Sequence, residues 1–437
     1  MNAERKYPFQ PAEVLVVEAS AGAGKTYALA KRYLNLLINP GLKPDEIPLK
    51  SILAVTFTNK ATAEMKERIL EFLKRLAFDE FGDNDKQRRA DLCQTFGIGN
   101  KEIQQKAVKI MDLIISDYDL FQVQTIDSFI NALLTGCALH IDRTAAFRIK
   151  DTPDKHIAYS LDFLIEESAK NKDARKTLER FVEQYLSASK PAGWFPKKKI
   201  FDVIVRLYEV SNIYGMAFNQ GKDDYGVVIK LKKEIFQKIE ELSAGIPEGQ
   251  NKNTTNKIKK VMEKRNEYFQ LGDLPYFYKY PEPPMNKGYV APDEYIKKWR
   301  GIIPLTERLS ELEAITKYPV YVNLFNLILE QFSMIAGKED VLFLSELNRK
   351  AADIISNEKV GIAELYYRLA TRFKHYLLDE FQDTSELQWR NLELMIDDAL
   401  ASGGSLFYVG DRKQAIFRFR GGEPRLFKQV ADDFKHY

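Results

Sequence analysis

The sequence predicts an α/β protein in which a parallel sheet with crossover helices is interrupted by a large, mainly helical insertion. Short β-rich runs alternate with longer helical patterns near the start of the chain, at residues 14–19, 51–57 and 121–125. The alternation resumes near the end, where residues 375–381 and 405–410 are strand candidates. Charged amphipathic helical stretches, such as VVIKLKKEIFQKIEEL, lie between. Two halves of one pattern around them favour an insertion into one sheet domain over a separate helical domain.

Three parts are therefore expected along the chain. The sheet domain takes residues 1–145 and 338–437, and the helical insertion takes residues 146–337. Helices in the sheet domain are predicted from apolar residues that recur on one face. These residues are Tyr27, Ala30, Leu34, Leu37 and Ile38 in the first helix, Met65, Ile69, Phe72, Leu73 and Leu76 in the second, and Leu387, Leu392 and Met395 in a third. Residues 273–295, rich in Pro, Gly and Tyr, are predicted to be an ordered surface loop or an extended linker.

Composition excludes several classes of protein. Of the 437 residues, 45% are apolar and 12% aromatic, which excludes a mostly disordered chain. Mean hydropathy is -0.35 and the most apolar runs are only strand-length, so no membrane span is expected. The N-terminus lacks the apolar core of a signal peptide, and two cysteines cannot form a disulfide framework, so a cytoplasmic location is expected. A net charge of +3 is too small to indicate nucleic-acid binding, and any DNA surface must be local.

The run ASAGAGKT at residues 19–26 has the spacing and context of a phosphate-binding loop, with a strand before it and an amphipathic helix after it. Gly22 and Gly24 let backbone N–H groups turn toward an anion, and the helix N-terminus adds its positive dipole. Lys25 would reach the β and γ phosphates of ATP, and the Thr26 hydroxyl would ligate Mg²⁺. A chance match in an ordinary loop is the alternative, which the flanking strand and helix disfavour.

A pair of carboxylates follows the apolar run HYLL. In doubly wound sheets the carboxyl ends of strands converge on the ligand, so Asp379 would hold Mg²⁺ and Glu380 would activate the attacking water. Without a phosphate loop elsewhere in the chain, an Asp-Glu pair after a strand would more often be a solvated turn.

The last strand candidate leads into GDRKQAIFRFRGG, where Gln414 could hydrogen-bond the γ phosphate or its water. Phe417, Arg418, Phe419 and Arg420 interleave aromatic rings with guanidinium groups, which suits a surface that stacks bases and holds phosphates. The alternative is an amphipathic edge with Phe417 and Phe419 in the core.

Together these motifs resemble the first, N-terminal motor domain of UvrD/Rep-type superfamily 1 DNA helicases, and most closely the RecB- and AddA-like helicase-nucleases (exonuclease V beta type). ASAGAGKT resembles motif I, AVTFTNKATAEMKERI motif Ia, TIDSF motif Ib, LLDEFQDT motif II and VGDRKQAIFRFRGG motif III. They occur in the family's order and span nearly the whole chain. The resemblance implies a RecA-like P-loop NTPase sheet with a helical subdomain inserted between motifs Ib and II.

The resemblance also implies roles for individual residues. Lys25, Asp379, Glu380 and Gln414 are the expected catalytic residues, and Thr26 and Asp379 the expected Mg²⁺ ligands. The expected ATP-binding residues are Ala21, Gly22, Ala23, Gly24, Lys25, Thr26 and Tyr27, with Gln10 at the adenine-reading position. The expected DNA-binding residues are Phe57, Thr58, Asn59, Thr125, Ser128, Phe417, Phe419 and Arg420. By their residues alone, TFTN and TIDSF are also typical of helix N-caps.

The expected function is an ATP-dependent DNA helicase motor half that acts on single- and double-stranded DNA in repair or recombination. Motifs IV to VI do not follow motif III, so the chain is expected to be a fragment that lacks the second motor domain and is weak or inactive alone. The resemblance implies 3′ to 5′ translocation and allows for a RecC- or AddB-like partner subunit. The competing hypothesis is a nucleotide-binding switch or scaffold without unwinding activity, and DNA-stimulated hydrolysis distinguishes the two.

Overall fold

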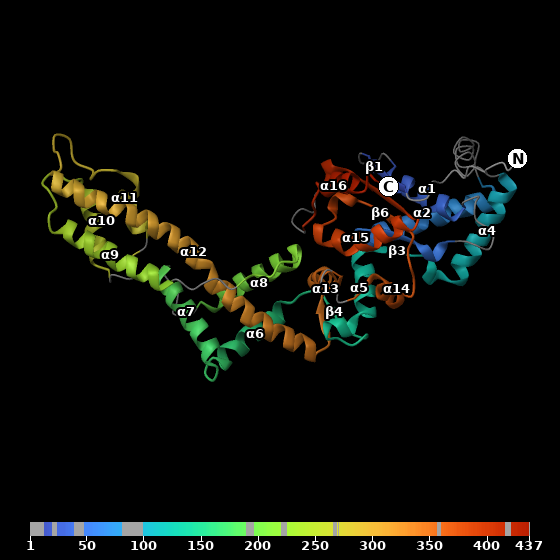
Figure 1. Ribbon diagram of the computed structural model, residues 1–437, viewed down its shortest axis with the longest axis horizontal. Coiled ribbons are helices and arrows are strands. Elements are labelled where there is room, and N and C mark those ends of the chain that lie inside the picture. The colour runs from blue at the N-terminus through green and yellow to red at the C-terminus, as the bar shows by residue number, and fades with distance from the viewer. Residues whose placement is uncertain are drawn as a thin grey trace. The chain divides into compact units, whose positions relative to one another are not determined.

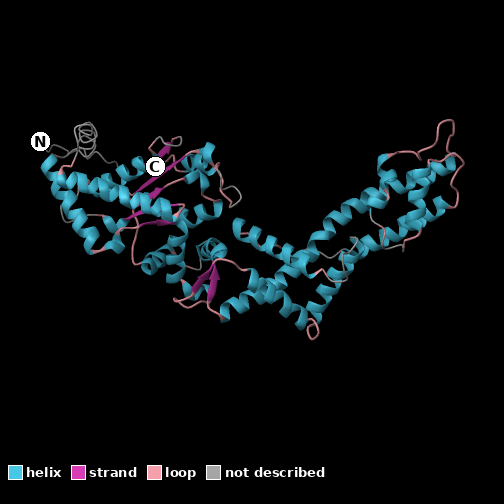
Figure 2. Ribbon diagram, turned by 180° about the vertical axis from the view of Figure 1, so that it is seen from behind, coloured by secondary structure: helices cyan, strands magenta, loops and turns pink. Residues whose placement is uncertain are grey.

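The computed structural model describes residues 13–19, 24–38, 48–80, 99–188, 196–219, 225–264, 269, 271–355, 360–415 and 421–436. These residues belong to two compact units. The first unit comprises Met1–Thr152, Val210–Met216 and Asp340–Tyr437, and the second comprises Pro153–Glu209 and Ala217–Glu339. Among the described residues, every named strand lies in the first unit, and the second is built from helices (Figure 2).

A five-stranded parallel sheet forms the centre of the first unit, which confirms the predicted α/β class. Its strands are β1 (Glu13–Glu18), β2 (Ile52–Thr56), β3 (Val123–Thr125), β6 (His375–Leu378) and β7 (Ser405–Gly410). Their order in the sheet is β1-β7-β6-β2-β3, with all neighbours parallel. The five predicted runs are these five strands, and the largest differences are that β3 starts later and β6 ends earlier than predicted.

Three helices cover one face of the sheet, namely α1 (Lys25–Leu37), α2 (Asn59–Phe78) and α4 (Asn100–Ser116) (Figure 1). Strand side chains alternate between faces, so Ile52 and Ala54 of β2 pack on this side while Leu53 and Val55 pack on the other. The apolar faces predicted for the first two helices are largely buried here. Each fully buried leucine or isoleucine stabilises the unit by about 1.5–3 kcal/mol relative to leaving it exposed.

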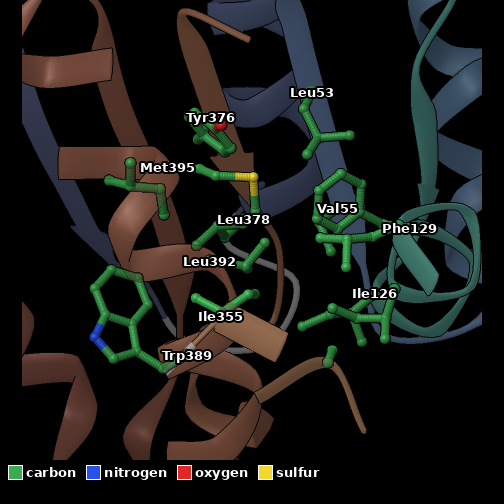
Figure 3. Packing of buried hydrophobic residues seen from close by; sticks show 14 of the residues in the cluster. Leu53, Val55, Ile126, Phe129, Ile355, Tyr376, Leu378, Trp389, Leu392 and Met395 are labelled. Carbon is green, nitrogen blue, oxygen red and sulfur yellow. The ribbon is translucent and has the colours of Figure 1, made fainter. Parts of the chain in front are cut away.

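The other face is covered by α5 (Ile126–Gly136), α13 (Leu347–Ile355), α14 (Ile362–Leu369), α15 (Glu386–Ala401) and α16 (Leu426–Asp433). Figure 3 shows this core, where Leu53, Val55 and Leu378 of the strands face Phe129, Leu392 and Met395 of the helices. Helix α15 begins at a capping box, because Ser385 accepts from the Gln388 N–H and the Gln388 side chain accepts from the Ser385 N–H. This box fixes the start of the helix directly after the acidic motif.

A second, two-stranded parallel sheet, which the sequence pattern did not reveal, joins β4 (Arg148–Lys150) to β5 (Val341–Phe343). The Thr144 N–H donates to Asp340 Oδ1 at 3.1 Å, beside the first strand pair. Three residues per strand are too few to stand out as a periodic pattern, so only the pairing itself identifies them. The sheet joins the two segments of the first unit that border the insertion.

The second unit consists of α6 (Asp154–Glu167), α7 (Lys172–Ala188), most of α8 (Lys197–Tyr214), α9 (Tyr225–Ser243), α10 (Lys252–Met262), α11 (Pro275–Lys279) and α12 (Asp293–Lys338). Its main core is formed by α9, α10, α11 and the first part of α12, with Trp299 fully buried against Phe277. The Trp299 indole N–H donates to the Tyr280 carbonyl at 3.1 Å. The segment 273–295 was predicted to be an ordered loop or linker without regular structure, but it contains the short helix α11, which Phe277 anchors in this core.

Helix α12 is 46 residues long and contains Pro304 and Pro319. It includes an 18-residue window apolar and long enough to cross a membrane, judged by length and composition alone. One such helix is weak support for a membrane span, because core helices of soluble proteins have the same character. The apolar side of α12 supplies core residues of the second unit.

Candidate nucleotide-binding and hydrolysis site

The candidate site lies at the carboxyl ends of three adjacent strands. Strand β7 lies between β1 and β6, so the phosphate loop after β1, the turn after β7 and the acidic pair after β6 meet at one edge of the sheet. The Ala19 N–H donates to the Gly410 carbonyl at 3.1 Å, and the Asp379 N–H donates to the Val55 carbonyl at 2.9 Å. These backbone bonds extend the pairing past the strand ends and fix where each loop starts.

The last residue of the phosphate loop before α1 is a glycine with a left-handed backbone conformation. Gly24 has φ +86° and is the N-cap of α1, a conformation that residues with a Cβ rarely adopt. The Ala28 N–H donates to its carbonyl at 2.9 Å, so α1 begins at Lys25. The remaining loop residues Ala21, Gly22 and Ala23, and the adenine candidate Gln10, lie outside the described residues.

Lys25 contacts the acidic pair directly. Its side chain is only 8% exposed, and Nζ donates to Glu380 Oε2 at 2.7 Å. Thr26 and Tyr27 occupy the same first turn of α1, and Tyr27 packs edge-to-face on Phe72 of α2. The two motifs predicted to form one site, 355 residues apart in sequence, are thus in contact.

Asp379 is buried, and Oδ1 accepts from the Glu380 N–H at 2.9 Å. Burial, together with the neighbouring Glu380 carboxylate, raises the pKa of Asp379 to about 6, while Lys25 and Arg68 act in the opposite direction. Glu380 itself has φ +47°, an uncommon backbone conformation for a residue with a Cβ. Two crowded carboxylates with partial cationic compensation form a site in which an additional cation would be stabilised.

The site fits a magnesium ion bound together with a nucleotide. The Thr26 hydroxyl and the Asp379 carboxylate are hard oxygen donors, and Mg²⁺ prefers one or two carboxylates plus phosphates and water to an all-protein cage. The described residues contain no cluster of three or more His, Cys, Asp or Glu side chains that could hold a metal by themselves.

The turn after β7 carries Gln414. Asp411 caps it, because its Oδ1 accepts from the Lys413 N–H at 2.9 Å and its carbonyl accepts from the Gln414 N–H at 2.8 Å. Arg412 donates through two nitrogens to the Glu18 carboxylate, at 2.8 and 3.0 Å, and this ion pair lowers the pKa of Glu18. The turn after β7 is thereby tied to the end of β1, directly before the phosphate loop.

The candidate DNA-binding residues follow the next two strands. Thr56 and Thr125 are register partners in β2 and β3, so the segments after them lie side by side. Thr58 caps α2 by accepting from the Ala61 N–H at 3.1 Å, and Thr125 caps α5 by accepting from the Ser128 N–H at 3.2 Å. Thr58, Asn59 and Ser128 are exposed, and Phe57 is partly exposed.

The nucleotide and DNA candidates are contiguous. Phe57 and Asp379 line one small cavity, of about 10 Å³, between the end of β2 and the end of β6. The remaining DNA candidates, Phe417, Phe419 and Arg420, lie outside the described residues, so the alternative that the two phenylalanines are core residues stays open.

Two residues near the acidic pair were not predicted. Arg68, on α2, is close enough to Asp379 for its charge to lower the pKa of that carboxyl, and Gln382 donates to Glu380 Oε2 at 2.7 Å. Both occur inside motifs that the sequence revealed, AEMKERI and DEFQDT. Only the fold shows that Gln382 contacts Glu380 and that the charge of Arg68 acts on Asp379.

A parallel sheet with a phosphate loop after one strand and an acidic pair after a nearby strand defines the class of P-loop nucleotide-binding motor domains. Within this class the chain belongs to the UvrD/REP helicase family, because residues 1–435 match the family's model for the UvrD/REP helicase N-terminal domain.

Several relatives are each named as a subunit of an ATP-dependent helicase/nuclease. The chain is 25% identical to the protein of Desulforamulus reducens, with 96% of the chain and 35% of the relative covered. It is 24% identical to that of Bacillus pumilus, with 97% and 35% covered. It is 27% identical to that of Clostridium kluyveri, with 98% and 36% covered. The chain thus spans about a third of the length of these relatives.

Proposed function

We propose that this chain is the ATP-binding and DNA-binding motor half of a superfamily 1 DNA helicase that acts in repair or recombination. The observation that carries the proposal is the contact of Lys25 with Glu380 at 2.7 Å, beside the buried Asp379. This contact supports a shared site for a phosphate-loop lysine and a candidate water-activating carboxylate. Residues 1–145 and 338–437 would form the motor domain, and residues 146–337 an inserted subdomain.

Each residue of the site has a chemical task in this proposal. Lys25 would exchange Glu380 for the β and γ phosphates, and Thr26 and Asp379 would hold Mg²⁺. Bound Mg²⁺ would neutralise charge on the phosphate oxygens. Glu380, released from Lys25, would orient and deprotonate the attacking water, and Gln414 would hydrogen-bond the γ phosphate. Arg68 would add positive charge on the α2 side.

The DNA track would start at the neighbouring strand ends. Phe57 would stack on a base, while Thr58, Asn59, Thr125 and Ser128 would donate to the backbone of single-stranded DNA. Phe417, Phe419 and Arg420 would extend the track. The relatives are named as one subunit of a helicase/nuclease, which supports a partner subunit of RecC or AddB type for this protein. We also propose 3′ to 5′ translocation, from the family resemblance of the motifs, and a cytoplasmic location, from the composition of the chain.

Hydrolysis by this chain alone is expected to be slow. The transition state spreads negative charge over the γ-phosphoryl oxygens, and an arginine from a second domain contributes on the order of 10³–10⁵ in rate in related phosphoryl-transfer enzymes. The same dependence on a second motor domain leads us to expect no unwinding by the chain alone. A switch or scaffold would bind ATP, but DNA would not stimulate ATP hydrolysis.

The test is equilibrium titration of a fluorescent ATP analogue with Mg²⁺, together with anisotropy of a labelled single-stranded oligonucleotide. Lys25→Ala should weaken analogue binding about 10–100-fold, because it removes a charge-assisted contact worth ~1.5–3 kcal/mol. Lys31→Ala, a lysine on the same helix but two turns away, is the matched control and should bind normally. Equal affinity in wild type and Lys25→Ala would refute the site, and a wild type that ignores DNA would favour the switch.

A further inference from the structure

Gln382 is buried, and both the nitrogen and the oxygen of its side-chain amide make hydrogen bonds within the proposed site. Only 1% of the residue is exposed. Nε2 donates to Glu380 Oε2 at 2.7 Å and to Asp383 Oδ2 at 3.3 Å, and Oε1 accepts from the Asp411 N–H at 2.9 Å. One side chain therefore connects the end of β6 to the end of β7. A buried amide with all these bonds made is held in one orientation, because rotating it would leave several buried polar groups unpaired.

The neighbouring backbone is shaped around this side chain. A Cβ added to Gly410 would lie 2.3 Å from Gln382 Oε1, so the last residue of β7 leaves room for the amide only because it is glycine. The next residue, Asp411, donates to Gln382 and also caps the turn that carries Gln414. Gln382 thus contacts Asp411, the residue that caps the 3₁₀ turn Arg412–Gln414.

Glu380 Oε2 accepts from both Lys25 and Gln382, each at 2.7 Å. When Lys25 turns to a phosphate, Gln382 is the hydrogen-bond donor that remains on this carboxylate among the described residues. The amide is neutral, so it fixes the direction of the carboxylate without adding a compensating positive charge. It also leaves Oε1 of Glu380 available to a water molecule.

We propose that Gln382 is a positioning residue that aims the Glu380 carboxylate at the attacking water and couples its position to the β7 turn that carries Gln414. This inference rests on the proposed function. The candidate DNA residues Phe417, Phe419 and Arg420 follow this turn in the sequence. Movement of the turn on DNA binding would shift Asp411 and, through Gln382, the carboxylate. Occupancy of the DNA track would then change the rate of hydrolysis more than the affinity for ATP.

The experiment separates binding from turnover in the full chain. Analogue affinity is measured by titration, and the hydrolysis rate by single-turnover phosphate release with protein in excess over ATP, with and without single-stranded oligonucleotide. Gln382→Met keeps the side-chain length but makes none of the three bonds. It should bind the analogue within about threefold of wild type and hydrolyse ATP up to ~10²-fold more slowly, the loss expected for a misplaced catalytic group. Stimulation by DNA should fall toward one.

Two further variants and one control sharpen the result. Gly410→Ala keeps the glutamine at position 382, but the added Cβ would displace its amide, so this variant should reproduce the slow hydrolysis. Gln382→Glu keeps the acceptor for Asp411 and removes the donor to Glu380, so it should also be slow. Asn391→Leu removes a buried amide and its hydrogen bond to the Asn348 carbonyl, at 2.9 Å, in the same unit without touching Glu380. It should lower the melting temperature yet leave the hydrolysis rate and DNA stimulation of wild type.

The outcomes distinguish this inference from the proposed function. Wild-type rates and DNA stimulation in Gln382→Met overturn the positioning role while the ATP site stands. A parallel loss of affinity, rate and melting temperature in both Gln382→Met and Asn391→Leu also overturns it, because such a loss is structural. If Gln382→Met does not fold, Gly410→Ala and Gln382→Glu decide by the same two readouts. Failure of the wild type itself to bind the analogue refutes the proposed function instead.

Discussion

His375, the first residue of β6, makes the stability of the first unit depend on pH. Its ring is largely buried, and Nδ1 lies 2.9 Å from Ser405 Oγ of the neighbouring strand. Burial, together with the charges of Arg32 and Lys374, lowers the pKa of His375 from 6.5 to about 4. The folded protein therefore keeps this imidazole neutral at pH values where the unfolded chain is protonated.

The difference in the pKa of His375 between the folded and unfolded states sets the sign and the size of the change in the free energy of unfolding with pH. Below about pH 6.5 the unfolded state binds one proton that the folded state does not, so the free energy of unfolding falls as pH falls, and the loss levels off below about pH 4. With ~1.36 kcal/mol per pKa unit, the loss between pH 7 and pH 5 is about 2 kcal/mol. His375→Asn places an amide near the position of Nδ1 and does not titrate, so it should lack this loss.

The assay is hydrogen exchange measured by mass spectrometry on the peptides that contain β6 and β7, which reports opening of this unit separately from the helical unit. Carboxylates elsewhere respond to pH equally in both proteins. The informative quantity is therefore the difference between wild type and His375→Asn, measured at pH 7 and at pH 5. An equal change in both proteins would show that His375 is protonated in the folded state and that the reasoning is wrong.

Three other predictions, made with four substitutions, test the packing and the DNA track. Gly404→Ala should destabilise the first unit by on the order of 3 kcal/mol in urea unfolding, because its Cβ would lie 2.0 Å from the Lys374 carbonyl oxygen; an unchanged midpoint would contradict this. Glu313→Gln leaves the buried Lys232 ammonium without its carboxylate partner at 2.7 Å, so it should lower the free energy of unfolding by about 3 kcal/mol. Lys232→Met should lower it by less than about 1 kcal/mol, because no unpaired buried charge remains. Equal shifts in melting temperature for the two variants would contradict this difference. Phe419→Ala should weaken single-stranded DNA binding by about 1–3 kcal/mol in anisotropy titrations, and unchanged affinity with a lower melting temperature would make Phe419 a core residue.

Much of the site was predictable because its signals are local. A phosphate loop needs small residues, a lysine and a hydroxyl within eight positions, and the helix dipole that completes it begins at the next residue. The helix caps at Thr58 and Thr125 are likewise decided within three residues, by a side-chain oxygen and a nearby N–H group. The five strands of the main sheet were visible as short β-rich runs, and two of these, the central strands β6 and β7, have both faces buried.

Other features required the tertiary structure. The strands β4 and β5 are too short for a periodic signal, and their pairing joins residues almost 200 positions apart, as the contact between Thr144 and Asp340 shows. The stretch EESAKNKDARKTLERFVEQYL, residues 166–186, is a charged amphipathic helical pattern in the sequence, yet it is interrupted between α6 and α7, at residues 168–171. Sequence periodicity indicates which residues prefer burial, but it does not indicate where the chain reverses direction.

The residue types of the proposed site can be identified from the motifs alone, since Lys25, Thr26, Asp379, Glu380 and Gln414 each have a chemistry that their motif reveals. How these residues combine depends on the fold. The strand order places β7 between β1 and β6, and that order brings Lys25 onto Glu380. It also turns Gln382 from an unremarked motif residue into a link between two loops. The physical reason is that motif chemistry depends on bonds within a few residues, whereas strand order depends on which apolar faces pack best across the whole sheet.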